Sequence, residues 1–149
     1  HVALSEALKA RTLHKTYRAV AMGSFKEETG VIEAPIARHP VDRKKMAVVE
    51  GGRYARTEYR VLEPLRGATL LEIDLITGRT HQIRVHFAHI GHPLLGDPVY
   101  GGKKTRDTAD RLMLHAFSIA FDHPVTGERL RFEAPEPTEF VREVRKRLP

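Results

Sequence analysis

The chain has 149 residues, 41% of them hydrophobic and 30% charged, which is typical of one soluble globular domain rather than a disordered segment. It has no cysteine and no apolar run long enough to span a bilayer, which excludes a disulfide framework and a thiolate metal site and favours a cytoplasmic protein. A net charge of +6 favours a polyanionic partner such as a nucleic acid, although a merely basic surface would have the same charge.

The first half of the chain predicts one short helix and then strands, because its apolar residues first recur at helical spacing and then alternate. The expected elements are a helix over residues 2–10, a strand over 14–22, a polar turn over 23–30, a strand over 31–36 broken by Pro35, a basic loop over 38–45, and strands over 47–50 and 55–62. Because Gly51 and Gly52 separate the last two strands, we expect those strands to form a hairpin.

The second half predicts further strands and two more helices. The expected elements are a strand with Leu71, Ile73 and Leu75 in its buried row, a helix starting near Arg79 with Ile83, Phe87 and Ile90 facing the core, a loop over 94–110, strands over 112–121 and 130–133, and a last helix capped by Thr138. Together the elements predict one α+β domain dominated by hairpin-linked strands, without an internal linker.

The most informative stretch is GRTHQIRVH, which begins where an alternating strand ends and enters a helix. The polar side chains that it brings to the expected opening turns are those of Arg79, His81, Gln82, Arg84 and His86. A helix start carries free N–H donors and a partial positive charge, so these residues suit an anion such as an RNA phosphate or a carboxylate.

Arg84 lies between Ile83 and Val85, at the expected boundary of the core. A guanidinium in that position rarely stays unpaired, so we expect a buried carboxylate partner. A functional arginine and a structural ion pair both fit this spacing. Asp97, in LLGDPVYGG, is interpreted as a turn former.

Neither a metal site nor a bound cofactor is expected. His86 and His89 lie three residues apart in the sequence, but the predicted helix contains no acidic residue and no HExxH pattern. The glycines follow neither GxGxxG nor GxxxxGK[ST] spacing, so a nucleotide cofactor is unsupported.

Two further features point toward RNA, each with a simpler alternative. Tyr17 lies in KTYRA with Ala19 and Ala21 nearby, which leaves room for a base to stack or for the phenol to move a proton, although a core tyrosine fits equally. The RHPVDRKK loop has the character of a phosphate-contacting arm, although a solvated loop would have the same composition.

Several separate motifs, in order, resemble those of the RluA/RluD-type pseudouridine synthases. They are LHKTYRAV, the API.RHP..R.KM stretch, T.YRVLE, LLEIDLITGRTHQIRVHFAHIGHPLLGDPVYGG and RLMLHAFSIAFDHPVTGERLRFEAP. The resemblance implies a mixed, largely antiparallel sheet flanked by helices, and an enzyme that isomerises uridine to pseudouridine in structured RNA, usually ribosomal, without a metal or an organic cofactor. Residues 1–149 would then be the C-terminal part of the catalytic domain.

The resemblance also implies roles for individual residues. Arg84 would pair with the family's catalytic aspartate, Tyr17 would stack on the base and relay a proton at its C5, and Leu114 would line the uracil pocket. The other residues that we expect to contact RNA are Lys15, Arg38, His39, Arg43, Lys44, Arg79, His81, Gln82, His86 and His115.

The family's aspartate lies in an HRLD motif upstream of the KxYxA strand, and the chain contains no HRLD. We therefore expect the nucleophile, and with it the carboxylate partner of Arg84, to come from a preceding segment. On this reading the chain alone does not make pseudouridine. The alternative function is a non-catalytic RNA-binding module on the same scaffold.

Overall fold

A computed structural model of the protein describes residues 13–149, except for the side chain of Lys104. The helix expected over residues 2–10 lies outside the described residues. The elements are β1 (His14–Met22), β2 (Thr29–Glu33), β3 (Ile36–Arg38), β4 (Met46–Val48), β5 (Arg56–Leu65), β6 (Ala68–Leu75), α2 (Gln82–His89), α3 (Lys103–Arg106), β7 (Leu114–Asp122), β8 (Arg129–Glu133) and α4 (Thr138–Lys146). No helix in the described part of the chain has the length and apolar character needed to cross a membrane.

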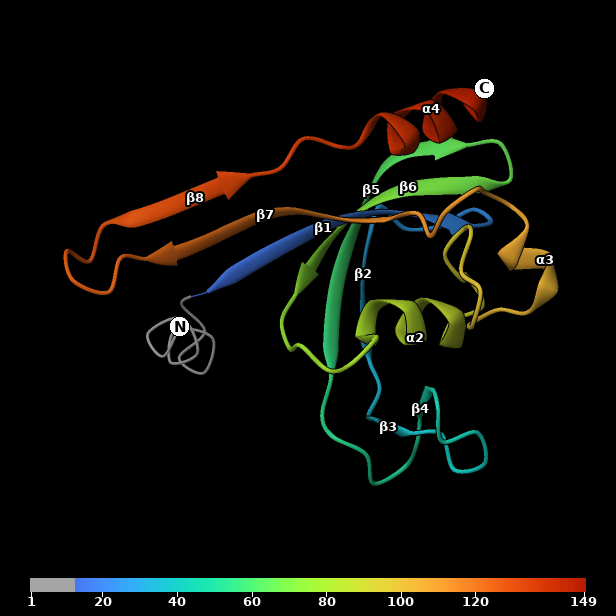
Figure 1. The fold of residues 1–149 in the computed structure, drawn as a ribbon, viewed down its shortest axis with the longest axis horizontal. Coiled ribbons are helices and arrows are strands. Elements are labelled where there is room, and N and C mark those ends of the chain that lie inside the picture. The colour runs from blue at the N-terminus through green and yellow to red at the C-terminus, as the bar shows by residue number, and fades with distance from the viewer. Residues whose placement is uncertain (1–12) are drawn as a thin grey trace.

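The main sheet has six strands in the order β2-β5-β6-β1-β7-β8, with β6 and β1 at its centre (Figure 1). Each neighbouring pair in this sheet is antiparallel. The expectation of an α+β domain with a largely antiparallel sheet flanked by helices is therefore confirmed.

The alternation of β1 divides its side chains between two hydrophobic cores on opposite faces of the sheet. Ala19 and Ala21 face α2, where Phe87 packs against them, whereas Val20 faces α4 and contributes to the core around Phe140. Figure 1 shows the two helices on opposite sides of the sheet. Phe87 and Phe140 are fully buried, and burial of each contributes about 1.5–3 kcal/mol of hydrophobic stabilisation.

The hairpin expected across Gly51 and Gly52 is wrong. β4 pairs with β3, in a register that sets Ile36 opposite Val48, and the basic loop 39–45 joins the two strands. β5 is unavailable to β4 because both of its edges are occupied, by β2 and by β6. We call residues 36–48 the basic arm; Figure 1 shows it apart from the main sheet, beyond α2.

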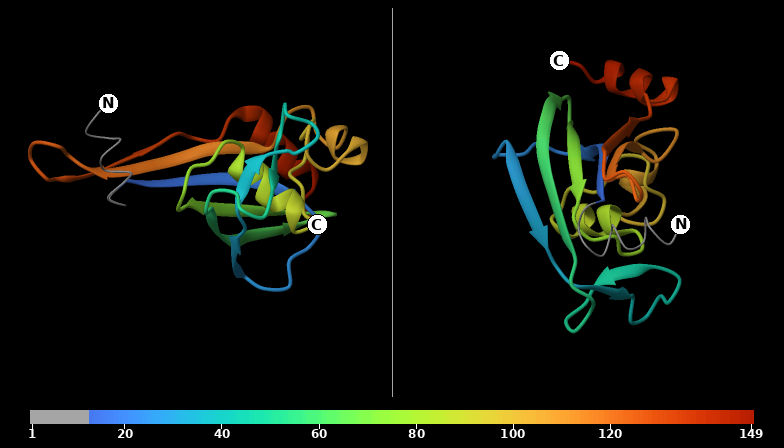
Figure 2. Two further views of the ribbon diagram at one scale, coloured as in Figure 1. Left: turned by 90° about the horizontal axis from the view of Figure 1, so that it is seen from below. Right: turned by 90° about the vertical axis from the view of Figure 1, so that its left-hand side faces the viewer.

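Two other regions complete the fold. β7 and β8 form a hairpin that projects from the body of the molecule, as Figure 2 shows. The stretch expected to be a loop over 94–110 contains the short helix α3. The turn between β5 and β6 is held against the end of α4 by a hydrogen bond of 2.8 Å from the amide of Arg66 to the carbonyl of Arg147.

Candidate functional site

The segment before α2 has a backbone that the sequence pattern did not predict. The helix begins at Gln82, so Arg79 and His81 precede it and do not lie in its opening turns. His81 has a φ of 55° and is the sole non-glycine residue in the described part of the chain with a positive φ. A histidine pays a steric cost in this conformation, which indicates that the surrounding contacts specify its position.

The buried side chain of Gln82 holds the segment between β6 and α2 in place. Its amide nitrogen donates to the carbonyl of Arg56 and to the hydroxyl of Thr57, both at 2.9 Å. Its amide oxygen accepts from the hydroxyl of Thr77 at 2.7 Å and from the amide of Arg79 at 3.0 Å. The side chain is 2% exposed and fully hydrogen-bonded, so it locks the end of β6 to the start of α2.

His86 is also buried, at 0% exposure, between two hydrogen-bond partners. Its Nε2 donates to the carbonyl of Ala34 at 2.9 Å, and its Nδ1 accepts from the hydroxyl of Thr57 at 2.8 Å. Burial lowers the pKa of His86, which favours this neutral form. The expectation that Gln82 and His86 contact RNA directly is at odds with this arrangement, because the polar atoms of both side chains are already used inside the protein.

Arg84 forms a bidentate ion pair with Asp97. Its Nε donates to Oδ2 at 3.0 Å and its Nη2 donates to Oδ1 at 2.9 Å. The expected buried carboxylate partner exists, but the expectation that it lies outside the chain is wrong: the loop after α2 supplies it. The hydrogen bonds that Arg84 donates to Asp97 raise the pKa of Arg84, so the guanidinium stays charged.

The loop that carries Asp97 depends on the glycine before it. Gly96 has a φ of +74°, and a Cβ at this position would lie 1.9 Å from the carbonyl oxygen of Arg111. Asp97 also accepts hydrogen bonds at Oδ1 from the amides of Val99 and Tyr100, which confirms it as a turn former. Burial alone raises the pKa of Asp97, but the bonds from Arg84 and the two amides outweigh it and hold the pKa below its usual value.

Tyr100 is a site residue that the sequence analysis missed. It is 6% exposed, and its ring lies 5.0 Å from the central guanidinium carbon of Arg84. Its hydroxyl accepts a hydrogen bond of 3.0 Å from the amide of Met46 and lies 2.8 Å from Nδ1 of His81. The available signal was its position three residues after Asp97, at the end of the same turn.

Tyr17 lies on the face of the sheet that α2 covers. It is opposite Ile73 in β6 and Ala116 in β7, and it packs at the edge of the core formed around Phe87. Burial raises the pKa of Tyr17, so its phenol stays protonated at neutral pH. Tyr17 and Lys15 also line a pocket of about 360 Å³ between β1, β7 and β8.

The register of β7 separates two of the expected site residues. Leu114 is opposite Ala19 and packs against the same core as Tyr17. His115 is opposite Arg18, on the other face, where its Nε2 donates to the carbonyl of Ala134 at 2.8 Å. His115 and Tyr17 therefore lie on opposite faces of the sheet, because adjacent residues of a strand point to opposite faces. The expected contact of His115 with RNA stays a prediction.

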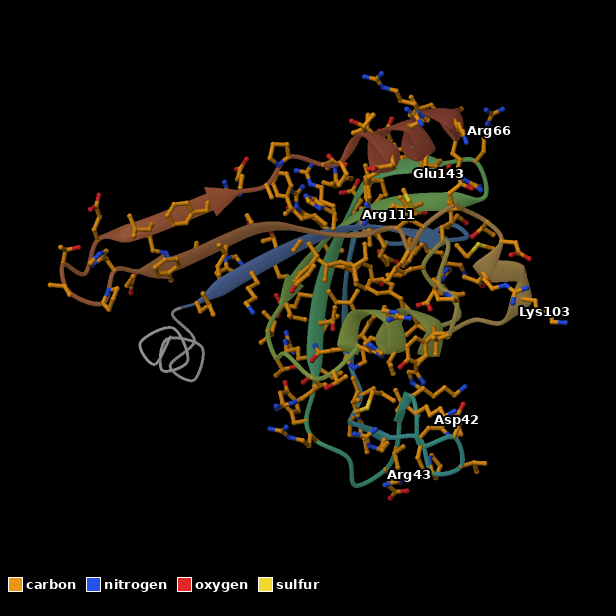
Figure 3. The ribbon with its side chains drawn as sticks, in the orientation of Figure 1. Asp42, Arg43, Arg66, Lys103, Arg111 and Glu143 are labelled. Atoms are coloured by element: carbon orange, nitrogen blue, oxygen red, sulfur yellow. The ribbon has the colours of Figure 1, made fainter. Side chains whose placement is uncertain are left out.

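The tip of the basic arm is ordered by its own polar groups. Nδ1 of His39 accepts from the amides of Val41 and Asp42, and Nη1 of Arg38 donates to the carbonyl of Arg43. The cationic side chains form no salt bridge with any residue in the range 13–149; they are Arg38, Arg43, Lys44 and Lys45. Figure 3 shows Asp42 and Arg43 near the tip, far from Arg66 and Glu143 beside α4.

Arg79 and His81 lie in the segment between β6 and α2. Nε of Arg79 donates to the carbonyl of Tyr54 at 2.8 Å, and His81 is exposed apart from its contact with Tyr100. Burial and then the charge of Arg84 lower the pKa of His81. Within residues 13–149, no group of three or more His, Asp or Glu side chains is arranged to hold a metal ion.

Comparison with known proteins gives a consistent result. Residues 1–89 match the family described as RNA pseudouridylate synthase. The ribosomal large subunit pseudouridine synthase D of Pseudomonas aeruginosa is 45% identical over 153 residues, which cover 95% of this chain and 48% of that protein. The protein of the same name from Nitrosomonas europaea is 48% identical over 145 residues, covering 93% and 42% respectively.

Solved structures agree with these sequences. Human RNA Pseudouridylate Synthase Domain Containing 1 superposes with a TM-score of 0.80 at 30% identity, over 91% of this chain and 60% of that one. Human RNA Pseudouridylate Synthase Domain Containing 4 gives 0.77 at 25% identity, over 96% and 65%. The chain spans about half the length of the curated relatives that it matches. The sequence, the sheet and the strand-to-helix motif all agree that the chain belongs to the RNA pseudouridylate synthase family, of the RluA/RluD type.

Proposed function

We propose that this chain forms the C-terminal part of the catalytic domain of an RNA pseudouridine synthase, which isomerises uridines in structured, ribosomal RNA. The observation that carries the proposal is the constrained Arg84, in the first turn of α2, the helix that covers the same face of the sheet as Tyr17. The family membership and the names of the relatives, which act on the large ribosomal subunit, support the substrate class.

Arg84 has donor capacity left for a second carboxylate. Asp97 occupies its Nε and one hydrogen of Nη2, and Nη1 makes no hydrogen bond to a described residue. The side chain is 14% exposed, so this free edge can meet a group that approaches from outside. We assign that edge to the catalytic aspartate, whose orientation and ionised state the guanidinium would maintain.

Asp97 is a poor candidate for the nucleophile itself. It is 0% exposed, Oδ1 accepts three hydrogen bonds and Oδ2 accepts one from Arg84. A nucleophile must reach the ribose or the base, and a fully buried carboxylate whose two oxygens are both hydrogen-bonded inside the protein cannot do so. We therefore assign Asp97 to positioning Arg84, and the nucleophile to a segment outside this chain.

Tyr17 is suited to contact the uracil base of the reacting uridine. Conversion of uridine to pseudouridine removes the proton at C5 of the uracil and leaves a proton at N1, so a group beside the ring must handle a proton. A phenol that burial keeps protonated can stack on the base and take part in that transfer. Leu114, packed against the same core, would form an apolar wall of the uracil pocket.

The basic arm would hold the RNA backbone. Its cations are unpaired among the described residues, and Lys or Arg in this state bind phosphate without reading sequence. A uridine must leave its stack to react, so backbone contacts on either side would help to hold it out.

Release of tritium from RNA labelled at C5 of uridine tests the function. We expect release with the protein as its gene encodes it, and RNA binding without release from residues 1–149 alone, once a cooperative thermal transition has established that this fragment is folded. RNA binding without release by the natural protein would instead favour the non-catalytic module. Release by residues 1–149 would contradict the assignment of the nucleophile to another segment.

A further inference from the structure

We propose that Tyr100 is a positioning residue that fixes the basic arm in register with Arg84, so that RNA held by the arm presents its uridine to the arginine. The catalytic part of this inference rests on the proposed function. The physical part, a tether between the arm and the arginine, does not depend on it.

Tyr100 contacts the arginine pair through its backbone and its ring. Its amide donates to Oδ1 of Asp97 at 3.0 Å, the oxygen that also accepts from Nη2 of Arg84. Its ring lies beside the guanidinium of Arg84, at a distance where cation–π attraction operates. The position of this tyrosine is thus set by the same groups that orient Arg84.

The hydroxyl of Tyr100 contacts the arm. It accepts from the amide of Met46, the first residue of β4, at 3.0 Å. Its own hydrogen has one acceptor within reach in the described structure, Nδ1 of His81 at 2.8 Å. The phenol therefore lies between the backbone of the arm and the strained residue at the start of α2, with both hydrogen bonds satisfied.

Apolar packing surrounds this hydrogen bond. Tyr100 shares a core cluster with Ile36 of β3 and Val85 of α2, and Met46 and Val48 of β4 pack against it. Within the described structure, no strand of the arm pairs with the main sheet, and β4 bonds to β3 alone. At its β3 end the arm is held by two backbone hydrogen bonds between Ile36 and Arg53, in the connection before β5. At its β4 end the contacts with α2 are this small cluster and the hydroxyl of Tyr100.

The contact between the arm and α2 matters because the arm and the reaction site act on the same RNA molecule. Phosphates bound at the arm tip fix one point of the backbone, and the reacting uridine must arrive at Arg84 from there. A displacement of about 1 Å between a binding group and a reacting group can reduce a rate about 100-fold. Weakening the contact between the arm and α2 should thus reduce the rate of the reaction more than the affinity for RNA.

The test compares Tyr100→Phe with Tyr54→Phe in the protein as its gene encodes it. Tyr100→Phe keeps the ring beside Arg84 and removes only the hydroxyl. Tyr54→Phe is the matched control, because it also removes a hydrogen-bonded hydroxyl; this hydroxyl donates at 2.7 Å to Glu33, which is not a residue of the arm. Thermal unfolding of each variant first establishes that the fold is retained.

Hydrogen exchange tests the tether without RNA. We expect the Met46 amide to exchange roughly five-fold faster in Tyr100→Phe, the factor that corresponds to about 1 kcal/mol for one lost hydrogen bond, while the Leu71 amide in β6 keeps its rate. Coupling is reciprocal, so Arg84→Lys should also accelerate exchange at Met46. Unchanged exchange at Met46 in both variants would overturn the tether.

Single-turnover kinetics test its consequence. We expect the rate at saturating RNA to fall by about 10- to 100-fold in Tyr100→Phe, with the RNA dissociation constant changed less than about three-fold. If exchange at Met46 is faster in Tyr100→Phe but the rate at saturating RNA is unchanged, Tyr100 does not position the arm for the reaction at Arg84. A wild-type protein that makes no pseudouridine contradicts the proposed function instead, and the exchange of Met46 in Tyr100→Phe and Arg84→Lys, measured without RNA, then decides the tether.

Discussion

Arg84 and Asp97 meet edge to edge, with the aspartate side chain fully buried and the arginine side chain 14% exposed. The pair connects the first turn of α2 to the loop that follows the helix. It leaves Nη1 of the arginine without a hydrogen bond to a described residue, and this is the edge that we propose for the catalytic carboxylate.

Removing the charge of Asp97 should destabilise the protein strongly. Asp97→Asn retains an oxygen for the turn but leaves Arg84 without its counter-charge, and breaking a buried pair costs about 3–5 kcal/mol. Urea unfolding at pH 7 measures the change. Asp122→Asn is the control, because its pair with Arg129 is about half exposed and such pairs contribute about 1 kcal/mol or less. Equal effects of the two changes would contradict a structural role for the Arg84–Asp97 pair.

The buried His86 predicts a loss of stability on mild acidification. Burial lowers its pKa in the folded protein, so the unfolded chain binds a proton more readily. The contribution is complete above the unfolded pKa of about 6.5 and is lost as the pH falls from there through the folded pKa. We expect unfolding free energies measured from pH 8 to pH 5 to decline, and His86→Gln to flatten that decline. An equally steep decline in His86→Gln would contradict this role of His86.

Loss of the Tyr17 hydroxyl should affect chemistry more than binding. Proton transfer by a placed side chain contributes about 100-fold or more, so we expect Tyr17→Phe to lower kcat by at least about 100-fold with an unchanged dissociation constant for RNA. Tritium release and filter binding measure the two quantities. Tyr59→Phe is the control, because Tyr59 is also partly buried but packs between Phe25 and Phe87. Full activity of Tyr17→Phe would limit Tyr17 to stacking or packing.

Neutralising the tip of the arm should weaken RNA binding in a salt-dependent way. Each lost phosphate contact reduces the slope of log K against log salt by about 0.7–0.9, so Arg43→Ala with Lys44→Ala should reduce it by about 1.5. Titrations between 50 and 200 mM salt measure this. The matched control is Arg142→Ala with Arg145→Ala, which removes two exposed charges from α4 on the opposite face of the sheet. A larger loss of slope in the control would place the RNA on the α4 face.

The sequence predicted most strands correctly because period-two alternation reports directly which residues are buried. β1 agrees residue for residue with the expected strand over 14–22, and the buried row at Leu71 and Ile73 lies in β6. The predicted hairpin at Gly51 and Gly52 failed for a different reason. A glycine pair signals a turn, but which strands pair across it depends on the edges that the rest of the sheet leaves open.

In the candidate site, too, some features could be predicted from the sequence and others could not. The motif around Arg84 and the arginine's need for a buried carboxylate could be read from the chain, since both depend on local residue types and burial. Asp97 was recognised only as a turn former, because its second role needs the loop to fold back onto α2. Likewise, Gln82 and His86 have the chemistry of RNA ligands, and only their burial assigns them to the interior.

By itself, the sequence determined most of the strands, the family and the identity of the polar groups at the strand-to-helix junction. These follow from local periodicity and from short motifs. The tertiary structure alone decided that Arg84 faces Asp97, that Tyr100 joins Arg84 to the basic arm, and that His115 is separated from Tyr17 by the sheet. Contacts between residues distant in the chain depend on how the elements pack, and a one-residue step along a strand is enough to move a side chain to the other face.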